Sequence, residues 1–354
     1  MNEARQSQGG RPVPPVPGGG GRAPAPAVLS LDIGGTKLAV GVVTADGEVH
    51  GLLIEPTRRW EGPDAVIARL FELGHRAVAA AGLDRPVDAV GISCGGPLDS
   101  STGVLISPPH LPGWLDVPLG SMARDEFGVP AFLENDATAA ALGEHRFGAA
   151  RGVRTMIYLT ISTGVGGGAV IDGRLHRGAA GNGGELGHLM VRPGGRLCSC
   201  GRRGCLEAYV SGTNIAERAA EGLGGPGSAG SSLAGLDPLT AADVAAAALA
   251  GDAYARAVWT DTTDVLGQAL TDLVNVFEPE LVVLGGGVTR AGAMLLDPVA
   301  EAVARDAMPP AAKAARVVLA GLGDVVCVVG AGVVALDVLA ASSGASGTTE
   351  AEHA

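Results

Sequence analysis

Two segments of the chain repeat one pattern, and this repeat constrains the fold more than any other feature. The first, VLSLDIGGTKLAVGVV, covers residues 28–43, and the second, MIYLTISTGVGGGAVI, covers residues 156–171. Each predicts a buried strand, a tight polar turn rich in glycine and a second strand, because β-type residues resume after the glycines. Two unrelated hairpins would give the same pattern. Two duplicated lobes, each directing a hairpin turn at a shared ligand, also explain why the pattern occurs twice.

The glycines in these turns predict a site for phosphate. Glycine lets the backbone approach a ligand closely, and successive N–H groups in such a turn can cradle an anion. The turns do not match the dinucleotide-binding fingerprint, in which the glycine turn opens a helix. Asp32 ends the first strand and could hold Mg²⁺ through water, although Asp before Gly is also ordinary turn chemistry.

A third glycine turn follows the predicted strand LVVLGGGV at residues 281–288. Three such turns at strand ends favour a nucleotide more strongly than any one of them. The residues that we expect to hold the nucleotide and its phosphates are Asp32, Gly34, Gly35, Thr36, Lys37, Thr163, Gly164, Gly285 and Gly286.

Alternating strands and helices indicate an α/β architecture in two lobes. Strands are expected at 87–93 and 129–134, and helices at 64–81, 137–147, 241–277 and 330–341. The expected division is a disordered Gly/Pro-rich leader at 1–27, a small lobe at 28–136 with the C-terminal helix 330–341, a large lobe at 137–329 and a flexible tail at 342–354.

Composition and charge exclude two classes of partner. No apolar run approaches the roughly 20 residues that a membrane helix needs, and residues 1–27 lack the apolar core of a signal peptide. We therefore expect a cytoplasmic chain with no membrane partner and with reduced thiols. The net charge of −12 and the absence of a Lys/Arg run argue against a nucleic-acid surface.

The sequence LENDATAA, residues 133–140, ends a strand and begins a helix. Asp136 at this place is either an N-cap, which satisfies free N–H groups of the helix, or a general base. As a base it would take the proton from a hydroxyl that attacks a phosphate, and Asn135 would bind neighbouring hydroxyls. Glu134 is expected to point to the opposite side, because side chains alternate along a strand.

Three of the five cysteines gather in CSCGRRGCLE, residues 198–207. They could form a disulfide, a redox pair or a metal site, or stay unliganded, and a reducing compartment argues against the disulfide. GGELGHL, residues 183–189, places Glu185 and His188 three residues apart, and His188 is only ten residues from Cys198. His188 with Cys198, Cys200 and Cys205 would make a closed tetrahedral Zn²⁺ site, which is typical of a structural metal. Cys94 and Cys327 are expected to be ordinary buried thiols.

Together these motifs resemble the ROK family of sugar kinases, within the actin/hexokinase-like superfamily. The resemblance spans about residues 28–341 and rests on DIGGTK, END, STGVGGG, ELGH and the complete CSCGRRGCLE. It implies a two-lobed α/β actin/hexokinase-like (ribonuclease H-like) fold with a zinc knuckle. It also implies ATP with Mg²⁺ as phosphate donor, structural Zn²⁺, and a homodimer or homotetramer.

The resemblance implies a role for individual residues. Asp136 matches the catalytic base, and His188, Cys198, Cys200 and Cys205 match the zinc ligands. The residues that match the sugar contacts are Gly96, His110, Asn135, Asp136, Glu185, His188 and Glu207. Many glucose kinases of the family have Asn where SPPHLPGW, residues 107–114, has His110, and SCGGPLD, residues 93–99, is similar to a loop of N-acylmannosamine kinases.

The expected activity is ATP-dependent phosphorylation of a hexose, with glucose and its 6-hydroxyl as the main expectation. N-acetylmannosamine or another hexose is the alternative substrate. A non-catalytic, sugar-sensing regulator of the same family is the alternative of another class. Such regulators carry an N-terminal helix-turn-helix, and residues 1–27 are too short and too rich in Pro and Gly to form one. Polyphosphate is a less favoured donor than ATP, because family members that use it generally lack the cysteine knuckle.

Overall fold

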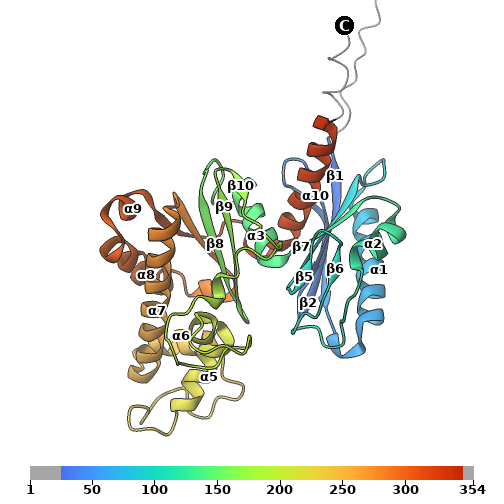
Figure 1. The fold of residues 1–354 in the computed structure, drawn as a ribbon. Helices are drawn as coiled ribbons and strands as arrows, with labels where there is room; N and C mark the ends of the chain where they lie inside the picture. The colour runs from blue at the N-terminus through green and yellow to red at the C-terminus, as the bar shows by residue number, and fades with distance from the viewer. Residues whose placement is uncertain (1–24, 346–354) are drawn as a thin grey trace, which may run out of the picture.

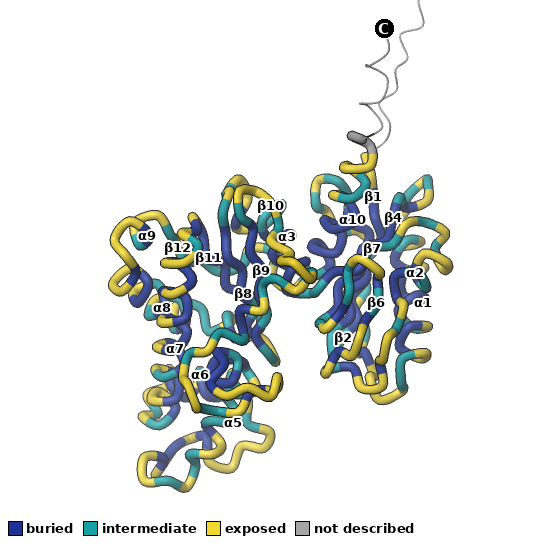
Figure 2. The backbone as a smooth tube through the Cα atoms, viewed as in Figure 1, coloured by how far each residue is buried: buried dark blue, intermediate teal, exposed yellow. Residues whose placement is uncertain are grey.

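The computed structural model describes residues 25–345, which form two lobes joined through two helices (Figure 1). Each lobe is built on a five-stranded sheet, and Figure 2 shows the buried residues concentrated in the two sheets and the helices on them. Residues 1–24 of the predicted leader and 346–354 of the predicted tail lie outside the described residues. Ala27, which was assigned to the leader, is already part of the first strand.

The first sheet has the strand order β3-β2-β1-β4-β7. Strands β1, β2 and β3 are antiparallel neighbours, whereas β4 and β7 continue from β1 in parallel. Helix α10 packs on β1 and β4. The elements of this lobe are β1 (Ala27–Ile33), β2 (Lys37–Thr44), β3 (Val49–Pro56), η1 (Arg59–Glu61), α1 (Pro63–Ala81), β4 (Ala89–Cys94), the small ribbon β5 (Leu98–Asp99) and β6 (Val104–Leu105), α2 (Leu119–Phe127) and β7 (Ala131–Asn135).

The second sheet repeats this topology, with the order β10-β9-β8-β11-β12. Strand β8 again pairs antiparallel with the next strand and parallel with the later β11, and β12 follows in parallel. The strands and the short helices of this lobe are β8 (Met156–Ile161), β9 (Val165–Ile171), β10 (Arg174–Leu175), η2 (Leu186–His188), α4 (Glu207–Val210), β11 (Leu281–Gly285), η3 (Gly287–Ala291), β12 (Arg316–Leu319) and η4 (Gly323–Val325). The predicted duplication is therefore confirmed at the level of strand order.

The other helices of this lobe are α5 (Gly212–Gly222), α6 (Ala241–Leu249), α7 (Ala253–Phe277), α8 (Ala293–Asp306) and α9 (Pro309–Ala314). Helix α8 packs on β12, and α7 packs on α5, α6 and α8. The segment expected to be helical at 241–277 is split into α6 and α7. Asp252 explains the second start, because its side chain accepts a hydrogen bond from the N–H of Ala255 and caps α7.

Helices α3 (Asp136–Arg146) and α10 (Val326–Ala345) lie between the lobes in Figure 1 and pack on each other. They cross at glycines: a Cβ on Gly143 would lie 3.1 Å from the N of Gly330, and one on Gly330 would lie 2.1 Å from the carbonyl O of Ala139. The two backbones approach this closely because neither glycine carries a side chain. Since α3 packs on β8 and β9, and α10 on β1 and β4, this crossing joins the lobes.

Helix α10 departs from two expectations. It spans Val326–Ala345 rather than residues 330–341, so residues 342–345 of the predicted tail belong to the helix. The segment Gly323–Ser342 is also long and apolar enough to cross a membrane, with a mean hydropathy of 2.3, where the sequence analysis expected no such run. Half of this segment is buried inside the fold, between the first sheet and α3, and this position accounts for its apolar composition.

Candidate active site and metal centre

Asp32 lies at the carboxyl end of β1, with Ser93 of β4 beside it. The Ser93 Oγ donates a hydrogen bond of 2.7 Å to Asp32 Oδ1, and only 7% of Asp32 is exposed. Burial raises the pKa of Asp32 to about 7, a rise that Ser93 opposes and the nearby Asp136 carboxylate reinforces. Lys37 also opposes the rise. A carboxylate with so raised a pKa is one that a bound cation would readily deprotonate.

The glycine turn after Asp32 is closed by a backbone hydrogen bond of 3.0 Å from the N–H of Gly34 to the carbonyl of Lys37. Thr57, which the sequence analysis did not select, braces this turn. Its hydroxyl donates to the carbonyl of Gly34 at 2.6 Å, and its N–H donates to the carbonyl of Thr36 at 3.0 Å. Thr57 is completely buried and lies in the loop after β3. This loop therefore stabilises the turn that carries Gly34 and Gly35.

His110 packs against Gly35 of the predicted site and against Gly95, the neighbour of the predicted Gly96. A Cβ on Gly35 would lie 3.2 Å from His110 Cβ, and one on Gly95 would lie 2.4 Å from His110 Cε1. Arg59 donates a hydrogen bond of 3.3 Å to the carbonyl of His110. Burial lowers the pKa of His110, Asp136 opposes that shift, and Arg59 adds to it, so the imidazole is neutral at neutral pH. His110 therefore joins the phosphate turn to the loop at residues 93–99.

The N-cap of α3 is Asn135, not Asp136. Asn135 Oδ1 accepts hydrogen bonds from the N–H groups of Ala137 at 3.0 Å and Thr138 at 3.2 Å. Asp136 occupies the first helical position, and its carboxylate accepts from the N–H of Ala137 at 2.8 Å. Burial raises the pKa of Asp136, whereas the Ala137 N–H and His110 oppose the rise. The capping role therefore belongs to Asn135, and Asp136 lies near the carboxylate of Asp32 and the imidazole of His110.

Gly96 lies next to Asn135, since a Cβ on Gly96 would come within 3.6 Å of Asn135 Nδ2. Cys94 is fully buried in the hydrophobic core, as expected, and its Sγ also lies 4.0 Å from His110 Nε2. Cys327 packs against the core of the second sheet but is only partly buried. Burial raises the pKa of both thiols, and Asp32 and Asp136 add to this rise for each.

Glu185 precedes the short helix η2 and His188 is its last residue, and their side chains approach each other, with 3.8 Å between Glu185 Oε2 and His188 Nε2. The other ring nitrogen of His188, Nδ1, lies 3.6 Å from Cys198 Sγ. Burial raises the pKa of Glu185, which His188 opposes and the charges of Asp136 and Glu207 reinforce. These acids therefore face a common space.

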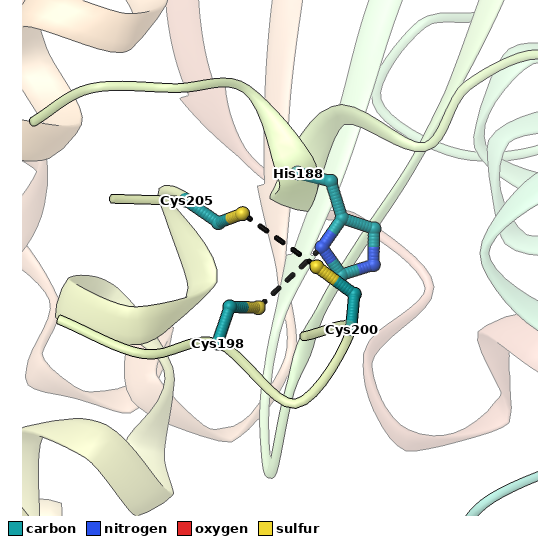
Figure 3. A group of neighbouring side chains, drawn as sticks. All are labelled: His188, Cys198, Cys200 and Cys205. Atoms are coloured by element: carbon teal, nitrogen blue, oxygen red, sulfur yellow. Dashed lines mark hydrogen bonds between the residues drawn. The ribbon is translucent and has the colours of Figure 1, made fainter. Parts of the chain in front are cut away.

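His188, Cys198, Cys200 and Cys205 bring their ligand atoms within 4.8 Å of one another (Figure 3). Cys200 Sγ lies 3.7 Å from Cys205 Sγ. Zn–S and Zn–N bonds of about 2.3 and 2.0 Å at tetrahedral angles place two sulfurs about 3.8 Å apart and a sulfur and a nitrogen about 3.5 Å apart. The donor atoms therefore fit Zn²⁺. The other ring nitrogen, Nε2, remains directed toward Glu185.

The backbone around the cysteines is a tight knuckle. The N–H of Cys198 donates to the carbonyl of Arg202 at 2.8 Å, and the N–H of Gly201 donates to the carbonyl of Cys198 at 2.9 Å. Gly204 needs to be glycine on two grounds: its φ is +86°, and a Cβ would lie 1.8 Å from the carbonyl O of Arg192. Arg192 and Arg218 pack over the ring of Tyr209 and both pair with Asp261, which anchors the knuckle to α5 and α7.

Glu207 begins α4, directly after the knuckle, and reaches the second hairpin turn. Its Oε2 accepts a hydrogen bond of 2.9 Å from the N–H of Val165, and its Oε1 accepts one of 2.7 Å from Ser199. A Cβ on Gly164 would lie 2.8 Å from Glu207 Oε2. Gly164 thus leaves room for Glu207, so in the large lobe, as Gly35 does with His110 in the small lobe, a predicted nucleotide residue lies against a predicted sugar residue.

A mostly apolar cavity of about 920 Å³ opens beside the second turn in the large lobe. Of the predicted nucleotide residues, Thr163 lines it, and Gly287 follows Gly285 and Gly286 to its wall. Gly286 instead packs on the carbonyl of Ile161, and Gly285 packs on the hydroxyl of Tyr158. Sequence reasoning missed most of the lining, which comes from η3 and the helices α5 to α8: Gly212, Thr213, Ala216, Glu217, Ala220, Leu239, Ala242, Ala245, Ala246, Trp259, Arg290 and Met294.

The residues 28–338 match the model of the ROK family. The chain belongs to this family. Among the relatives of this ROK protein, the glucokinase of Thermotoga maritima is 37% identical over 284 residues, which cover 80% of this chain and 88% of the relative. The N-acetylmannosamine kinase of Citrobacter koseri is 38% identical over 263 residues, covering 74% of this chain and 84% of the relative.

A crystal structure of a ROK family glucokinase from Streptomyces griseus, in complex with glucose and AMPPNP, aligns with this ROK protein with a TM-score of 0.72. The two are 34% identical, and the alignment covers 86% of this chain and 98% of the other. A xylose repressor of Caldicellulosiruptor bescii is 30% identical over 283 residues, covering 78% of this chain and 69% of the relative. The family thus includes kinases and repressors.

Proposed function

We propose that this protein is an ATP-dependent hexokinase that transfers the γ-phosphoryl group of ATP to the 6-hydroxyl of glucose. The observation that carries the proposal is the position of Asp136, which begins α3 directly after β7, at the same edge of the first sheet where Asp32 ends β1 before its glycine turn. The similarity to the Thermotoga maritima glucokinase and to the Streptomyces griseus complex with glucose and AMPPNP supports this choice.

In the proposed reaction Asp136 is the general base. It accepts the proton of the sugar hydroxyl as that oxygen attacks the γ-phosphorus, and the bond to the departing ADP oxygen breaks with its electron pair. The raised pKa of Asp136 favours this proton transfer, because it brings the acceptor closer to neutral pH. The helix N-terminus at the same place supplies a positive partial charge near the transferred group.

The sugar hydroxyls would be bound by side chains from both lobes. His110 and Asn135 contribute from the small lobe beside Gly96, and Glu185, His188 and Glu207 contribute from the large lobe. His188 would bind Zn²⁺ through Nδ1, which fixes the tautomer that presents Nε2 to the sugar. Zn²⁺, when bound, would hold the knuckle closed together with Cys198, Cys200 and Cys205.

The nucleotide would occupy the 920 Å³ cavity in the large lobe, with its phosphates at the turn of Thr163 and Gly164 and its γ-phosphate toward the turn of Gly34 and Gly35. Apolar walls of this kind suit a flat base. Mg²⁺, when bound with ATP, neutralises phosphate charge, and Asp32 beside Lys37 is the group placed to hold it.

A panel of sugars in a coupled ADP-release assay tests the proposal. We expect the highest kcat/KM with glucose and ATP. Because polyphosphate releases no ADP, that donor is tested by measuring the sugar phosphate formed, and we expect a much lower kcat/KM with it. The absence of ADP release with every hexose would contradict the kinase assignment and favour a sugar-sensing regulator. Purified protein examined by light scattering would test the homodimer or homotetramer that we also propose, and fractionation would test the cytoplasmic location.

N-acetylmannosamine is the second candidate substrate. Gly96 leaves space beside Asn135, and His110 occupies the place of the usual Asn. An acetamido group needs such an open neighbourhood, and the Citrobacter koseri N-acetylmannosamine kinase is among the relatives. The same panel separates the two substrates, since a higher kcat/KM for N-acetylmannosamine than for glucose would reverse their order.

A further inference from the structure

Glu134 is a completely buried acid to which the proposed phosphoryl transfer assigns no role. In the register of the first sheet, Asp32 lies beside Ser93, and Ser93 lies beside Glu134. Side chains at paired positions of neighbouring strands share one face of a sheet. The three polar side chains therefore form a row on one face, which starts at the proposed metal-binding carboxylate and ends at the edge strand β7.

The two oxygens of Glu134 have separate partners. Oε1 accepts a hydrogen bond of 3.0 Å from the N–H of Asn135, the residue that caps α3 and precedes Asp136. Oε2 accepts a hydrogen bond of 3.1 Å from Arg177 Nε. Burial raises the pKa of Glu134, while the Asn135 N–H and Arg177 oppose the rise. A buried carboxylate that is satisfied on both oxygens is held in one orientation.

Arg177 belongs to the other lobe, just after β10, and its side chain is about half exposed at 48%. The loop that it starts is closed by a hydrogen bond of 2.8 Å from the N–H of Gly183 to the carbonyl of Arg177. Glu185 follows that closure by two residues. The chain of contacts therefore runs from the amide of Asn135 through Glu134 and Arg177 to the base of the loop that carries Glu185.

We propose that Glu134 and Arg177 form a positioning pair, which holds the catalytic corner at Asp136 in register with the sugar-binding Glu185 of the opposite lobe. The inference rests on the proposed kinase function and adds two residues to it. A misplacement of about 1 Å between a base and its substrate can lower a rate by about a hundredfold. The pair acts on the geometry of both groups and touches neither substrate.

A double-mutant cycle tests this pair. We expect Glu134→Gln and Arg177→Met each to lower kcat/KM for the sugar by about ten- to a hundredfold, with KM for ATP changed by less than about twofold. The double variant should be no worse than the poorer single variant, because the residues act as one unit. Arg177→Lys should recover part of the loss. Arg154→Met, which removes an ion pair with Asp172 that is about three-quarters exposed, is the matched control and should leave kcat/KM unchanged.

A purely structural role would give a different result. Effects that multiply in the double variant, or a lowered melting temperature with unchanged kcat/KM in the folded protein, would overturn the inference. Because the Arg177 side chain is half exposed, we expect its variants to fold even where Glu134→Gln does not. Calorimetric titration with glucose adds a readout that is independent of turnover: binding should weaken in Arg177→Met and stay unchanged in Arg154→Met.

The failure of the inference can be told apart from the failure of the proposed function. If the wild type phosphorylates a hexose but the cycle is multiplicative, the kinase assignment stands and the positioning pair is wrong. If the wild type neither turns over nor binds any sugar, the proposed function fails, and the positioning pair fails with it.

Discussion

The carboxylate of Glu207 accepts a hydrogen bond from the backbone N–H of Val165, with 2.9 Å between Oε2 and N. Glu207 follows the last cysteine of the knuckle by two residues, and Val165 is the first residue of β9, directly after the second glycine turn. The proposed metal centre is thereby joined to the turn that flanks the proposed nucleotide cavity. A metal bound at the knuckle would therefore help to hold the second glycine turn, and a nucleotide bound at that turn would help to hold the knuckle.

Gly164→Ala tests this junction. The new Cβ would lie 2.8 Å from Glu207 Oε2 and would push the carboxylate from its place, without backbone strain, since the φ of Gly164 is not positive. We expect KM for the sugar to rise by about tenfold with a smaller effect on ATP. Gly227→Ala is the matched control, because a Cβ there meets nothing within 4 Å. Equal kinetics for both variants would show that Glu207 does not contact the sugar.

Asp136→Asn should lower kcat by about a hundredfold to ten-thousandfold, the range that a general base contributes. The cap of α3 is Asn135, so the substitution leaves the helix N-terminus intact and the fold unchanged. Sugar affinity measured by calorimetry should survive. Turnover close to that of the wild type would rule out Asp136 as the base.

Cys200→Ala should lose about one zinc per chain, measured by atomic absorption, because three ligands remain of the four that a closed structural site needs. Sugar affinity should fall more than ATP affinity, since His188 and Glu207 both depend on the knuckle. Cys327→Ala removes a cysteine outside the cluster and should keep its zinc. Retained zinc together with an unchanged Kd for the sugar in Cys200→Ala would contradict the role proposed for the metal.

Asp32→Asn should stabilise the ligand-free protein at pH 8 while abolishing activity. The pKa of Asp32 is raised to about 7 in the folded state, so the folded protein binds this proton more tightly than the unfolded chain. Well below the ordinary pKa of 3.8 both states are protonated and there is no penalty. The penalty grows as the pH rises from about 4 to 7, where only the unfolded chain loses its proton, and above 7 it is complete, on the order of 2–4 kcal/mol. Urea unfolding should show a much larger variant advantage at pH 8 than at pH 4.5. A less stable variant at pH 8 would disprove the burial penalty.

The fold could be predicted in outline from the sequence, because its main signals are local. The glycine turns between runs of β-type residues predicted both hairpins. The helix predicted at 64–81 corresponds to α1, and the strand and turn predicted at 281–288 correspond to β11 and the turn after it. The ends of α10 were misplaced because the valine-rich residues 326–329 do not indicate a helix and Ser342, Ser343 and Gly344 favour a helix end. The helix is instead defined by its packing between the first sheet and α3.

The candidate site was predicted where its residues lie in compact motifs. The three cysteines lie within eight residues and His188 precedes them by only ten, and the structure brings their ligand atoms together. Thr57 and Arg177 carried no such signal, because each acts through one long-range contact with a residue of another segment. The cavity wall of α5 and α6 was missed for the same reason, since small apolar side chains on a helix are typical of any core.

The crossing of α3 and α10 sets the spacing of the whole molecule. At Gly143 and Gly330 the two backbones lie against each other, and a single methyl group on Gly330 would overlap the carbonyl of Ala139. Helix α3 packs on the second sheet and α10 packs on the first. The distance between the two lobes therefore depends on the absence of side chains at Gly143 and Gly330. Two glycines that lie 187 residues apart in the sequence (330 − 143) thus set how closely the two lobes approach each other.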